Sequence, residues 1–336
     1  MRKLERYLGI VLLVLLTGMV CSCGKERTIE RNQGKAVVDL TFYTRNTSDN
    51  QDESTAPLED NENFKTIRVI VTNQNNDILA NIYDDNLPEG GVSEYTLRIV
   101  GLPADEMLNF YVIGNEASVG KDFSDLSSGF TLLDTEIIDS EKKYFPKMRS
   151  QISSLGLPIT GVMQVQSLQD GVNTLNIGCT HSVVKVVLNV NNLMNESFWV
   201  TQANFGKFIT DRTYLFAQES LGLPEHVTPN SYSFSSTNGT GLEIKTEENN
   251  AVFVFYIYET GLIPYENYSL SLTSATVPEL AEEKYIFGEG AGEKFLTRNQ
   301  QLNINATIDI QKEVSVQITY NVKDWTTASI EIPSFN

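Results

Sequence analysis

Cysteine and histidine are scarce in this sequence: 336 residues hold three cysteines and two histidines. Two of the cysteines lie within the first 23 residues, so Cys179 alone is left for the body of the chain, which excludes a framework of internal disulfides. Cys179 lies in a strand-like run, which favours a small buried hydrophobic side chain over a nucleophile. With His181 and His226 as the only imidazoles, little is available for a metal site or a catalytic triad.

Catalytic motifs are missing as well. The sequence contains no G-x-S-x-G, no H-E-x-x-H and no Walker loop. The acidic stretch 49–62 lacks the residue order of an EF-hand, so a solvated loop is favoured there over a calcium site. Carboxylate pairs that meet only in space are not visible in a sequence. We therefore expect no enzyme, with no catalytic residues, no metal and no cofactor.

Basic charge is also in deficit. The chain has 43 acidic and 25 basic residues and a formal net charge of −18. Removal of residues 1–22, which hold three basic residues and one acidic residue, would bring this charge to −20. A surface this acidic argues against binding to nucleic acid or to an anionic membrane surface, and it favours solubility outside the cell.

The longest hydrophobic run lies at the N-terminus. Three basic residues precede the run 8–19, which has the length of a signal-peptide core and is shorter than the roughly 20 residues that span a bilayer. The following Val20-Cys21-Ser22-Cys23-Gly24 resembles a bacterial lipobox, in which Cys23 fits the acylated position better than Cys21. Residues 1–22 are therefore predicted to be a lipoprotein signal peptide, with Cys23 lipidated and anchored in the outer membrane. An ordinary secretory signal with two incidental cysteines is the alternative.

Strand-like segments make up most of the remaining chain. Residues 23–35 are a polar spacer, and in residues 36–44 the apolar Val38, Leu40 and Phe42 alternate with more polar neighbours, as in a half-buried strand. Further strand-like runs are 64–72, 94–100, 108–114, 159–167, 174–177, 183–190, 199–205, 251–258, 268–275, 301–310 and 314–322. This pattern predicts a mainly β fold of two β-sandwich domains with minor helix, divided into residues 36–181 and 182–336.

Three segments are expected to depart from the strand pattern. Residues 46–63 are polar and acidic with almost nothing to bury, so a mobile, exposed loop is predicted. Residues 231–241 form the longest polar connection of the second half and are also predicted to be a loop. In residues 123–140 apolar side chains recur at helix-like spacing, which predicts one or two short helices. These side chains are Leu126, Phe130, Leu133 and Ile137.

Several short motifs occur in a characteristic order after the lipobox. They are 67–71 (IRVIV), 110–115 (FYVIGN), 157–161 (LPITG), 296–302 (LTRNQQL) and 322–325 (VKDW). The most specific are Arg298-Asn299 at the start of a strand and Trp325 near the end of the chain. In this order the chain resembles the fimbrillin family, the subunits of type V pili. The resemblance covers nearly the whole mature chain and implies two transthyretin-like sandwiches and export to the cell surface as a lipoprotein. It also implies assembly by strand exchange with copies of itself or related fimbrial subunits.

The resemblance also implies a processing step by an arginine-specific protease, which removes the lipid together with the first strand. The matching bond here is Arg45–Asn46. Its position between a strand-like segment and a polar loop agrees with protease access. The alternative is that Arg45 is an ordinary loop charge.

Loss of residues 36–44 would remove Val38, Leu40 and Phe42 and leave an apolar groove flanked by unpaired backbone groups. The C-terminal tail, residues 326–336, is a candidate donor strand for the groove of a neighbouring subunit. Its Ala328, Ile330 and Ile332 lie on one face of an alternating segment. Such a head-to-tail contact does not close, so it builds a filament. Alternatively, the tail is the last strand of its own domain.

The sequence also fits other functions at the cell surface. An anchor subunit, or a tip or accessory subunit, would stay lipidated; the anchor is not cut, and a tip adhesin would bind a ligand through its C-terminal domain and need no donor tail. A surface glycan-binding lipoprotein is a different class, whose sites usually show exposed aromatic side chains. The aromatic residues that could supply such a platform are Tyr256, Tyr258, Tyr265 and Tyr268, although tyrosines on strands more often pack inside a sandwich.

Overall fold

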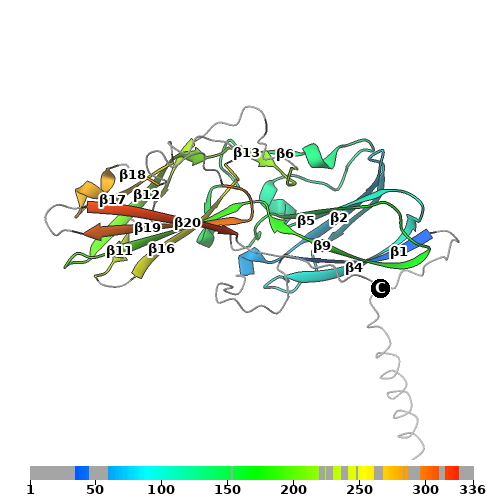
Figure 1. Cartoon of the computed structure of the whole chain (residues 1–336), viewed down its shortest axis with the longest axis horizontal. Coiled ribbons are helices and arrows are strands. Elements are labelled where there is room, and N and C mark those ends of the chain that lie inside the picture. Colours follow the sequence, from blue (N-terminus) through cyan, green and yellow to red (C-terminus); the bar gives the residue numbers. More distant parts are fainter. Residues whose placement is uncertain are drawn as a thin grey trace, which may run out of the picture.

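The computed structural model describes residues 35–44, 60–152, 154–218, 224, 230–235, 241–246, 249–260, 268–282, 284–286, 296–309 and 315–324. Within these residues the protein is mainly β, as predicted, and its helices are short 3-10 turns. The strands form two layered halves that lie side by side along the long axis of the molecule (Figure 1). No helix among the described residues is long and apolar enough to cross a membrane.

The N-terminal half packs a three-stranded sheet, of order β4-β1-β9, against a five-stranded sheet, of order β10-β8-β5-β2-β3. The strands are β1 Lys35–Tyr43, β2 Ile67–Asn73, β3 Ile78–Asp84, β4 Glu94–Pro103, β5 Leu108–Gly114, β8 Ile159–Val165, β9 Gly171–Gly178 and β10 Thr180–His181. Inward side chains of both sheets form one core, in which Val38, Val69 and Phe110 have no exposed surface. The alternating apolar pattern of β1 thus becomes one layer of a sandwich.

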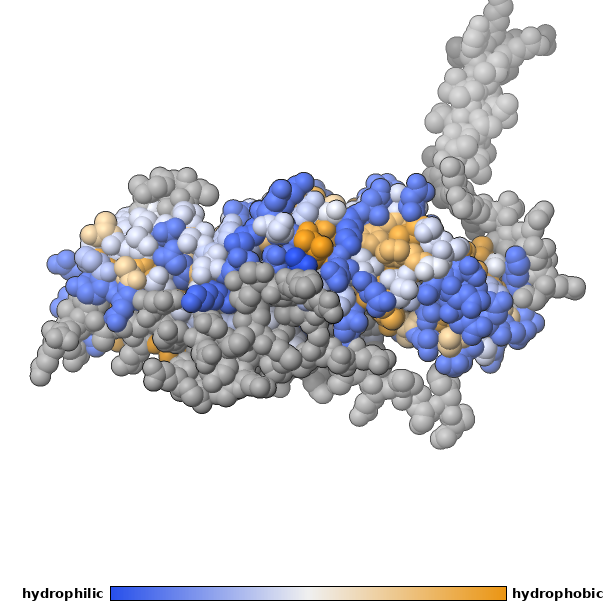
Figure 2. All heavy atoms as spheres, turned by 90° about the horizontal axis from the view of Figure 1, so that it is seen from above, coloured by the Kyte–Doolittle hydropathy of each residue, from blue (hydrophilic) through white to orange (hydrophobic). Residues whose placement is uncertain are grey.

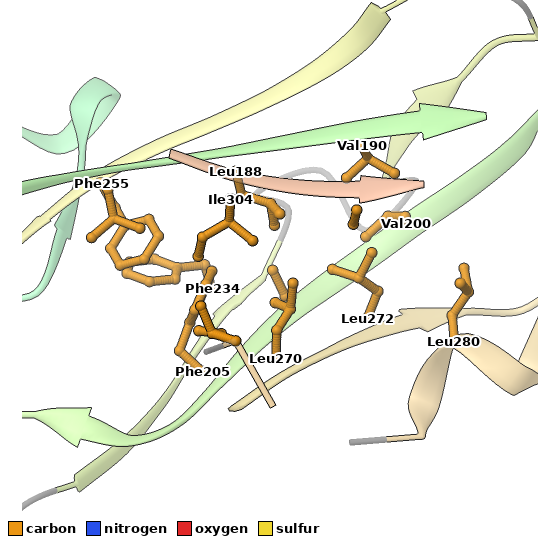
Figure 3. Close-up of a cluster of buried hydrophobic side chains, with 14 of the residues drawn as sticks. Leu188, Val190, Val200, Phe205, Phe234, Phe255, Leu270, Leu272, Leu280 and Ile304 are labelled. Carbon is orange, nitrogen blue, oxygen red and sulfur yellow. The ribbon is translucent and has the colours of Figure 1, made fainter. Parts of the chain in front are cut away.

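The C-terminal half repeats this layering. One sheet has the order β20-β19-β11-β16-β7 and the other the order β14-β12-β17-β18, with β15 paired to β12. The strands are β11 Val184–Asn192, β12 Phe198–Ile209, β14 Asn230–Ser235, β15 Leu242–Ile244, β16 Asn249–Ile257, β17 Ser269–Ser274, β18 Lys284–Tyr285, β19 Gln300–Asp309 and β20 Ser315–Asp324. Figure 3 shows Leu188, Phe255 and Ile304 of the first sheet facing Phe205 and Leu270 of the second.

A third hydrophobic cluster joins the two halves. It contains Ile70 and Tyr111 from the outer face of the N-terminal five-stranded sheet, together with Val254 and Tyr256 from β16. Two short strands that lie between β5 and β8 in the sequence pair with strands of the C-terminal half. β6 Glu136–Ile138 pairs with β13 Arg212–Tyr214, and β7 Lys147–Met148 pairs with β16. Because β2 and β5 bury residues on both faces, their sequences are nearly continuous apolar runs instead of alternating ones.

The short helical turns serve mainly as connections around these sheets. They are η1 Asp60–Glu62, η2 Glu116–Val119, η3 Leu132–Asp134, η4 Arg149–Gln151 and η6 Pro278–Ala281. Most predicted strands are present within a few residues of their expected bounds. The division into domains at residues 181 and 182 stays a prediction.

Two expectations about regular structure are wrong. The predicted helices in residues 123–140 are replaced by irregular chain, the three-residue turn η3 and the short strand β6. Gly129 has a φ of 85°, which a helix does not allow, and of the four helix-spaced side chains Phe130 and Leu133 are exposed while Ile137 is buried. The predicted loop at 231–241 begins with the strand β14, in which Phe234 is the buried side chain of an otherwise polar segment.

Candidate assembly site around the first strand

Strand β1 lies in the middle of its sheet. It pairs with β4 in antiparallel register, from Lys35 opposite Pro103 to Tyr43 opposite Glu94. On its other edge it pairs with β9 in parallel register, from Ala36 opposite Gly171 to Tyr43 opposite Gly178. Removal of β1 would therefore leave unpaired backbone groups along both β4 and β9.

The inward side chains of β1 are fully buried. Ala36, Val38, Leu40 and Phe42 have no exposed surface, and Phe42 packs edge-on against Phe64 with 5.5 Å between the ring centroids. Burial of side chains such as Val, Leu and Phe contributes about 1.5–3 kcal/mol each. The three larger side chains of β1 together then stabilise the sandwich by roughly 5–9 kcal/mol. The strand is an integral part of the core, so its loss would open a deep apolar groove.

The outward side chains of β1 form polar contacts across the same sheet. Arg98 of β4 donates two hydrogen bonds to Asp39, from Nε to Oδ1 at 2.6 Å and from Nη2 to Oδ2 at 2.7 Å. These hydrogen bonds are the main reason that the pKa of the Asp39 carboxyl lies below its usual value. Two residues further along the strand, the hydroxyl oxygens of Thr41 and Thr96 are 2.9 Å apart.

The predicted processing and donor residues lie outside the described part of the chain. This applies to Cys23, to Arg45 and Asn46, and to Ala328, Ile330 and Ile332 of the tail. The end of β1 itself is described: the Tyr43 carbonyl accepts a hydrogen bond from Cys179 N at 2.9 Å, and Thr44 N donates to Ser93 O at 2.9 Å. The sheet pairing of β1 therefore continues to the last described residue before Arg45.

Residues 60–62 correct the expectation of an exposed loop throughout 46–63. Glu62 is buried, and Lys185 of β11 donates to its Oε1 at 2.6 Å. The backbone carbonyl of Glu62 is 2.9 Å from Nε2 of His181, and Asn61 O accepts a hydrogen bond from Leu157 N at 2.8 Å. The turn η1 thus fixes the chain after the acidic segment to both halves of the molecule.

Arg298 and Asn299, the motif at the start of β19, connect several segments of the C-terminal half. Arg298 forms an ion pair with Glu259, and its guanidinium donates to the carbonyl oxygens of Tyr214 and Leu215 at 2.6 and 2.8 Å. Asn299 has a φ of 60°, and its backbone N donates to Val183 O at 2.9 Å. These contacts give the motif a structural role.

Tyrosines on β16 and β17 do not form an exposed platform. Tyr256, Tyr258 and Tyr268 have no exposed surface. Burial raises the pKa of Tyr268 to about 12. Three of the four aromatic residues considered for glycan stacking therefore belong to the interior, and Tyr265 lies outside the described residues.

The thiol and the imidazole in the described residues are both buried. Burial raises the pKa of the Cys179 thiol and lowers the pKa of His181, so the environment favours the neutral form of each. The described residues contain no group of three His, Cys, Asp or Glu side chains arranged to hold a metal ion. In Figure 2 the visible face is largely hydrophilic, with separate hydrophobic patches.

Comparison with protein-family models finds no match, and neither does comparison with curated proteins. Solved structures, in contrast, share the fold over almost the whole molecule. A putative cell adhesion protein from Parabacteroides distasonis aligns with a TM-score of 0.58 at 13% identity, covering 89% of this chain and 99% of the other. The tip fimbrial protein Mfa3 from Porphyromonas gingivalis, with C-terminal truncation, gives 0.54 at 12% identity, with coverages of 86% and 100%.

This chain has the fold of fimbrial and putative cell adhesion proteins. A further protein of the second kind, from Bacteroides eggerthii, aligns with a TM-score of 0.52 at 13% identity and covers 87% of this chain and 96% of its own length. At identities this low the likeness concerns the fold, and function has to be argued from the site.

Proposed function

We propose that this protein is a structural subunit of a cell-surface fimbria. It is exported with the signal peptide 1–22, lipidated at Cys23 and held at the outer membrane. An arginine-specific protease then cuts between Arg45 and Asn46, β1 leaves the sandwich, and the tail 326–336 of another copy or of a related fimbrial subunit takes its place. The support is the fold shared with fimbrial and putative cell adhesion proteins, together with the position of β1.

The observation that carries this proposal is the central position of β1 in its sheet. The strand has β-sheet partners on both edges and four fully buried side chains, so its removal creates a groove that only another alternating strand fills. Downstream of Arg45, the turn η1 is held by Lys185 and Leu157 independently of β1. These contacts therefore still hold η1 against both halves of the subunit after β1 has been removed.

The charge of the processed subunit fits a soluble form. Residues 23–45 carry five basic and three acidic residues, so the formal charge after cleavage falls from −20 to −22. Cleavage also removes Cys23 and its lipid, and a lipoprotein thus becomes a water-soluble subunit. Repulsion between such subunits is screened at physiological salt, where the Debye length is about 8 Å.

The test is to treat the purified full-length protein with an arginine-specific protease, read its N-terminus and run it on a gel without boiling. We expect a new N-terminus at Asn46 and an SDS-resistant ladder. Deletion of residues 326–336 should abolish the ladder, and Arg45→Lys should prevent both cleavage and polymerisation. Arg31→Lys is the matched control, because Arg31 lies before β1. A protein that is cut at Arg45 and stays monomeric refutes the proposal.

The likeness to the tip fimbrial protein Mfa3 also favours a second candidate, a fimbrial anchor, tip or accessory subunit that stays lipidated. Such a subunit would keep β1 in place. In the same experiment it would retain an acylated Cys23 and form no ladder of its own.

A further inference from the structure

Arg98 marks one position along the groove that β1 occupies. The outward residues of β1 face Val100, Arg98, Thr96 and Glu94 of β4. On β9 the partners at these positions are Val172, Thr174, Asn176 and Gly178. Arg98 is the only basic side chain in either row, and its guanidinium holds Asp39 through both carboxylate oxygens. A strand that replaces β1 therefore meets a single cation, at the position of Asp39.

The C-terminal tail carries a single acidic side chain, Glu331. When Glu331 is placed at the position of Asp39, the inward positions of Ala36, Val38 and Leu40 are taken by other apolar residues with the same alternation. These residues are Ala328, Ile330 and Ile332. In the same alignment Phe335 comes to the position of Tyr43, and Ser334 to the position of Phe42.

Side-chain size alone does not select this register. A slip by one residue would turn the apolar face of the tail to solvent and is excluded. A slip by two residues keeps the alternation and puts Ile332 at the position of Phe42, which fills that part of the groove better than Ser334 does. It also moves Glu331 away from Arg98 to a position opposite Thr96, and brings Ser329 to Arg98.

We propose that Arg98 sets the register of the donor strand by pairing with Glu331 from a second copy of this chain. The inference rests on the proposed function, because it assumes that the tail enters the groove left by β1. The pairing reproduces the two hydrogen bonds that Asp39 makes in the uncleaved subunit. Arg98 thus acts as a specificity residue, since it favours a donor with a carboxylate at this position over one without.

Cross-linking at a neighbouring position reports the register while Arg98 and Glu331 stay intact. The Tyr43 carbonyl bonds toward β9, whereas Thr44 N bonds toward β4. Val37, which has the same orientation as Tyr43, therefore faces Val100 as a non-hydrogen-bonded pair, next to the irregularity between Ala36 and Val37. The Cα separation of such pairs, about 4.5 Å, lies within the range that a disulfide spans. In the proposed register Ser329 faces Val100, and in the slipped register Thr327 does.

The experiment compares two double variants, V100C/S329C and V100C/T327C, after arginine-specific cleavage and mild oxidation. Cleavage removes Cys21 and Cys23, and both variants also carry C179A, so the introduced thiols are the only ones left in the processed subunit. We expect V100C/S329C to give a ladder that survives boiling and is reversed by a reductant, and V100C/T327C to give little. The reverse pattern, or an SDS-resistant ladder in which neither pair cross-links, overturns the register but leaves the proposed function standing.

The role of Arg98 is tested by adding R98A to both backgrounds. The ratio of the two cross-linked products should then shift about 2- to 5-fold toward V100C/T327C. A change of this size is what the loss of an exposed ion pair produces. The charge swap R98E with E331R should restore the original ratio, and Asp39→Asn should leave it unchanged because β1 is absent from the polymer. An unchanged ratio with R98A refutes the role of Arg98. If the unsubstituted protein forms no ladder at all, the proposed function fails, and the register with it.

Discussion

Strands β1 and β11 occupy equivalent places in the two halves of the molecule. Each is the first described strand of its half and lies between an antiparallel and a parallel neighbour. These neighbours are β4 and β9 for β1, and β16 and β19 for β11. Both also bury an alternating row of apolar side chains without exposed surface.

The surroundings of the two strands differ. Beyond β19 and β16 the sheet of β11 continues with β20 and β7, whereas the described part of the β1 sheet ends at β4 and β9. On the outward face, Lys185 of β11 is buried against Glu62, while the Asp39–Arg98 pair of β1 lies at the surface. The same topology thus gives one strand, β11, that lies inside a five-stranded sheet with a buried outward ion pair, and another, β1, whose removal leaves β4 and β9 without their shared partner in the described sheet.

The largest expected effect concerns the two outward ion pairs. Glu62→Ala leaves the Lys185 ammonium buried without its carboxylate, so the free energy of unfolding should fall by about 3–5 kcal/mol. Asp39→Ala is the matched variant on β1, and because its pair is exposed we expect a loss of less than about 1 kcal/mol. Urea unfolding of the uncleaved protein measures both. Equal losses for the two variants would contradict the difference between the strands.

The next largest effect concerns the inward side chains of β1 and β11. Leu40→Ala and Leu188→Ala each remove a fully buried leucine, so each should destabilise the uncleaved protein by about 2–5 kcal/mol. After cleavage at Arg45 only Leu188→Ala should still weaken the subunit, because Leu40 leaves with β1. Thermal melting of the processed subunits measures the difference. A persistent effect of Leu40→Ala would show that β1 stays bound.

A smaller effect depends on pH at the contact between the halves. Burial keeps His181 neutral and its pKa below the ordinary value of 6.5, despite the opposing influence of Glu62 and the hydrogen bond with Asn299. Above pH 6.5 this group adds no pH dependence. As the pH falls below 6.5 the unfolded chain binds the proton first, so stability should fall by at most about 1.4 kcal/mol per pH unit until the folded pKa is reached.

The control for this pH effect is His181→Gln, which lacks the titrating group. Denaturant midpoints between pH 5 and 8 should fall less steeply on the acid side for this variant than for the unsubstituted protein. Parallel pH profiles would rule out the imidazole as the source of the dependence.

The smallest expected change is in thiol reactivity, without a change in fold. Cys179 packs in the same core as Phe42, and its backbone N bonds to Tyr43 at the end of β1. Labelling of Cys179 by a thiol reagent should be slow in the uncleaved protein, faster once β1 has been removed, and slow again in the polymer. A labelling rate that is the same in all three states would contradict both the opening of the groove on loss of β1 and its filling in the polymer.

Local sequence pattern predicts the strands that bury one face. β1 and β11 alternate clearly, and both were expected close to their observed bounds. The failures occur where burial depends on distant residues. Glu62 belongs to a polar run but is buried because Lys185, far along the chain, neutralises it, and β14 is held in its sheet by pairing with β12 although Phe234 is its only buried side chain.

The candidate site was predicted in part. Alternation in the sequence identified Val38, Leu40 and Phe42 as one face of a strand, and all three are buried in the structure. The contact between Arg98 and Asp39 was missed, because a salt bridge across strands is visible only once the register between β1 and β4 is known. Likewise, the motif Arg298-Asn299 was identified without its partners, since Glu259, Tyr214 and Leu215 come from other segments.

The most direct test of the account is the mass and N-terminus of the subunit isolated from native cell-surface material. We predict a polypeptide that begins at Asn46, carries no acyl chains and runs as an SDS-resistant ladder before boiling. A monomer that begins with acylated Cys23 and still contains β1 would contradict it.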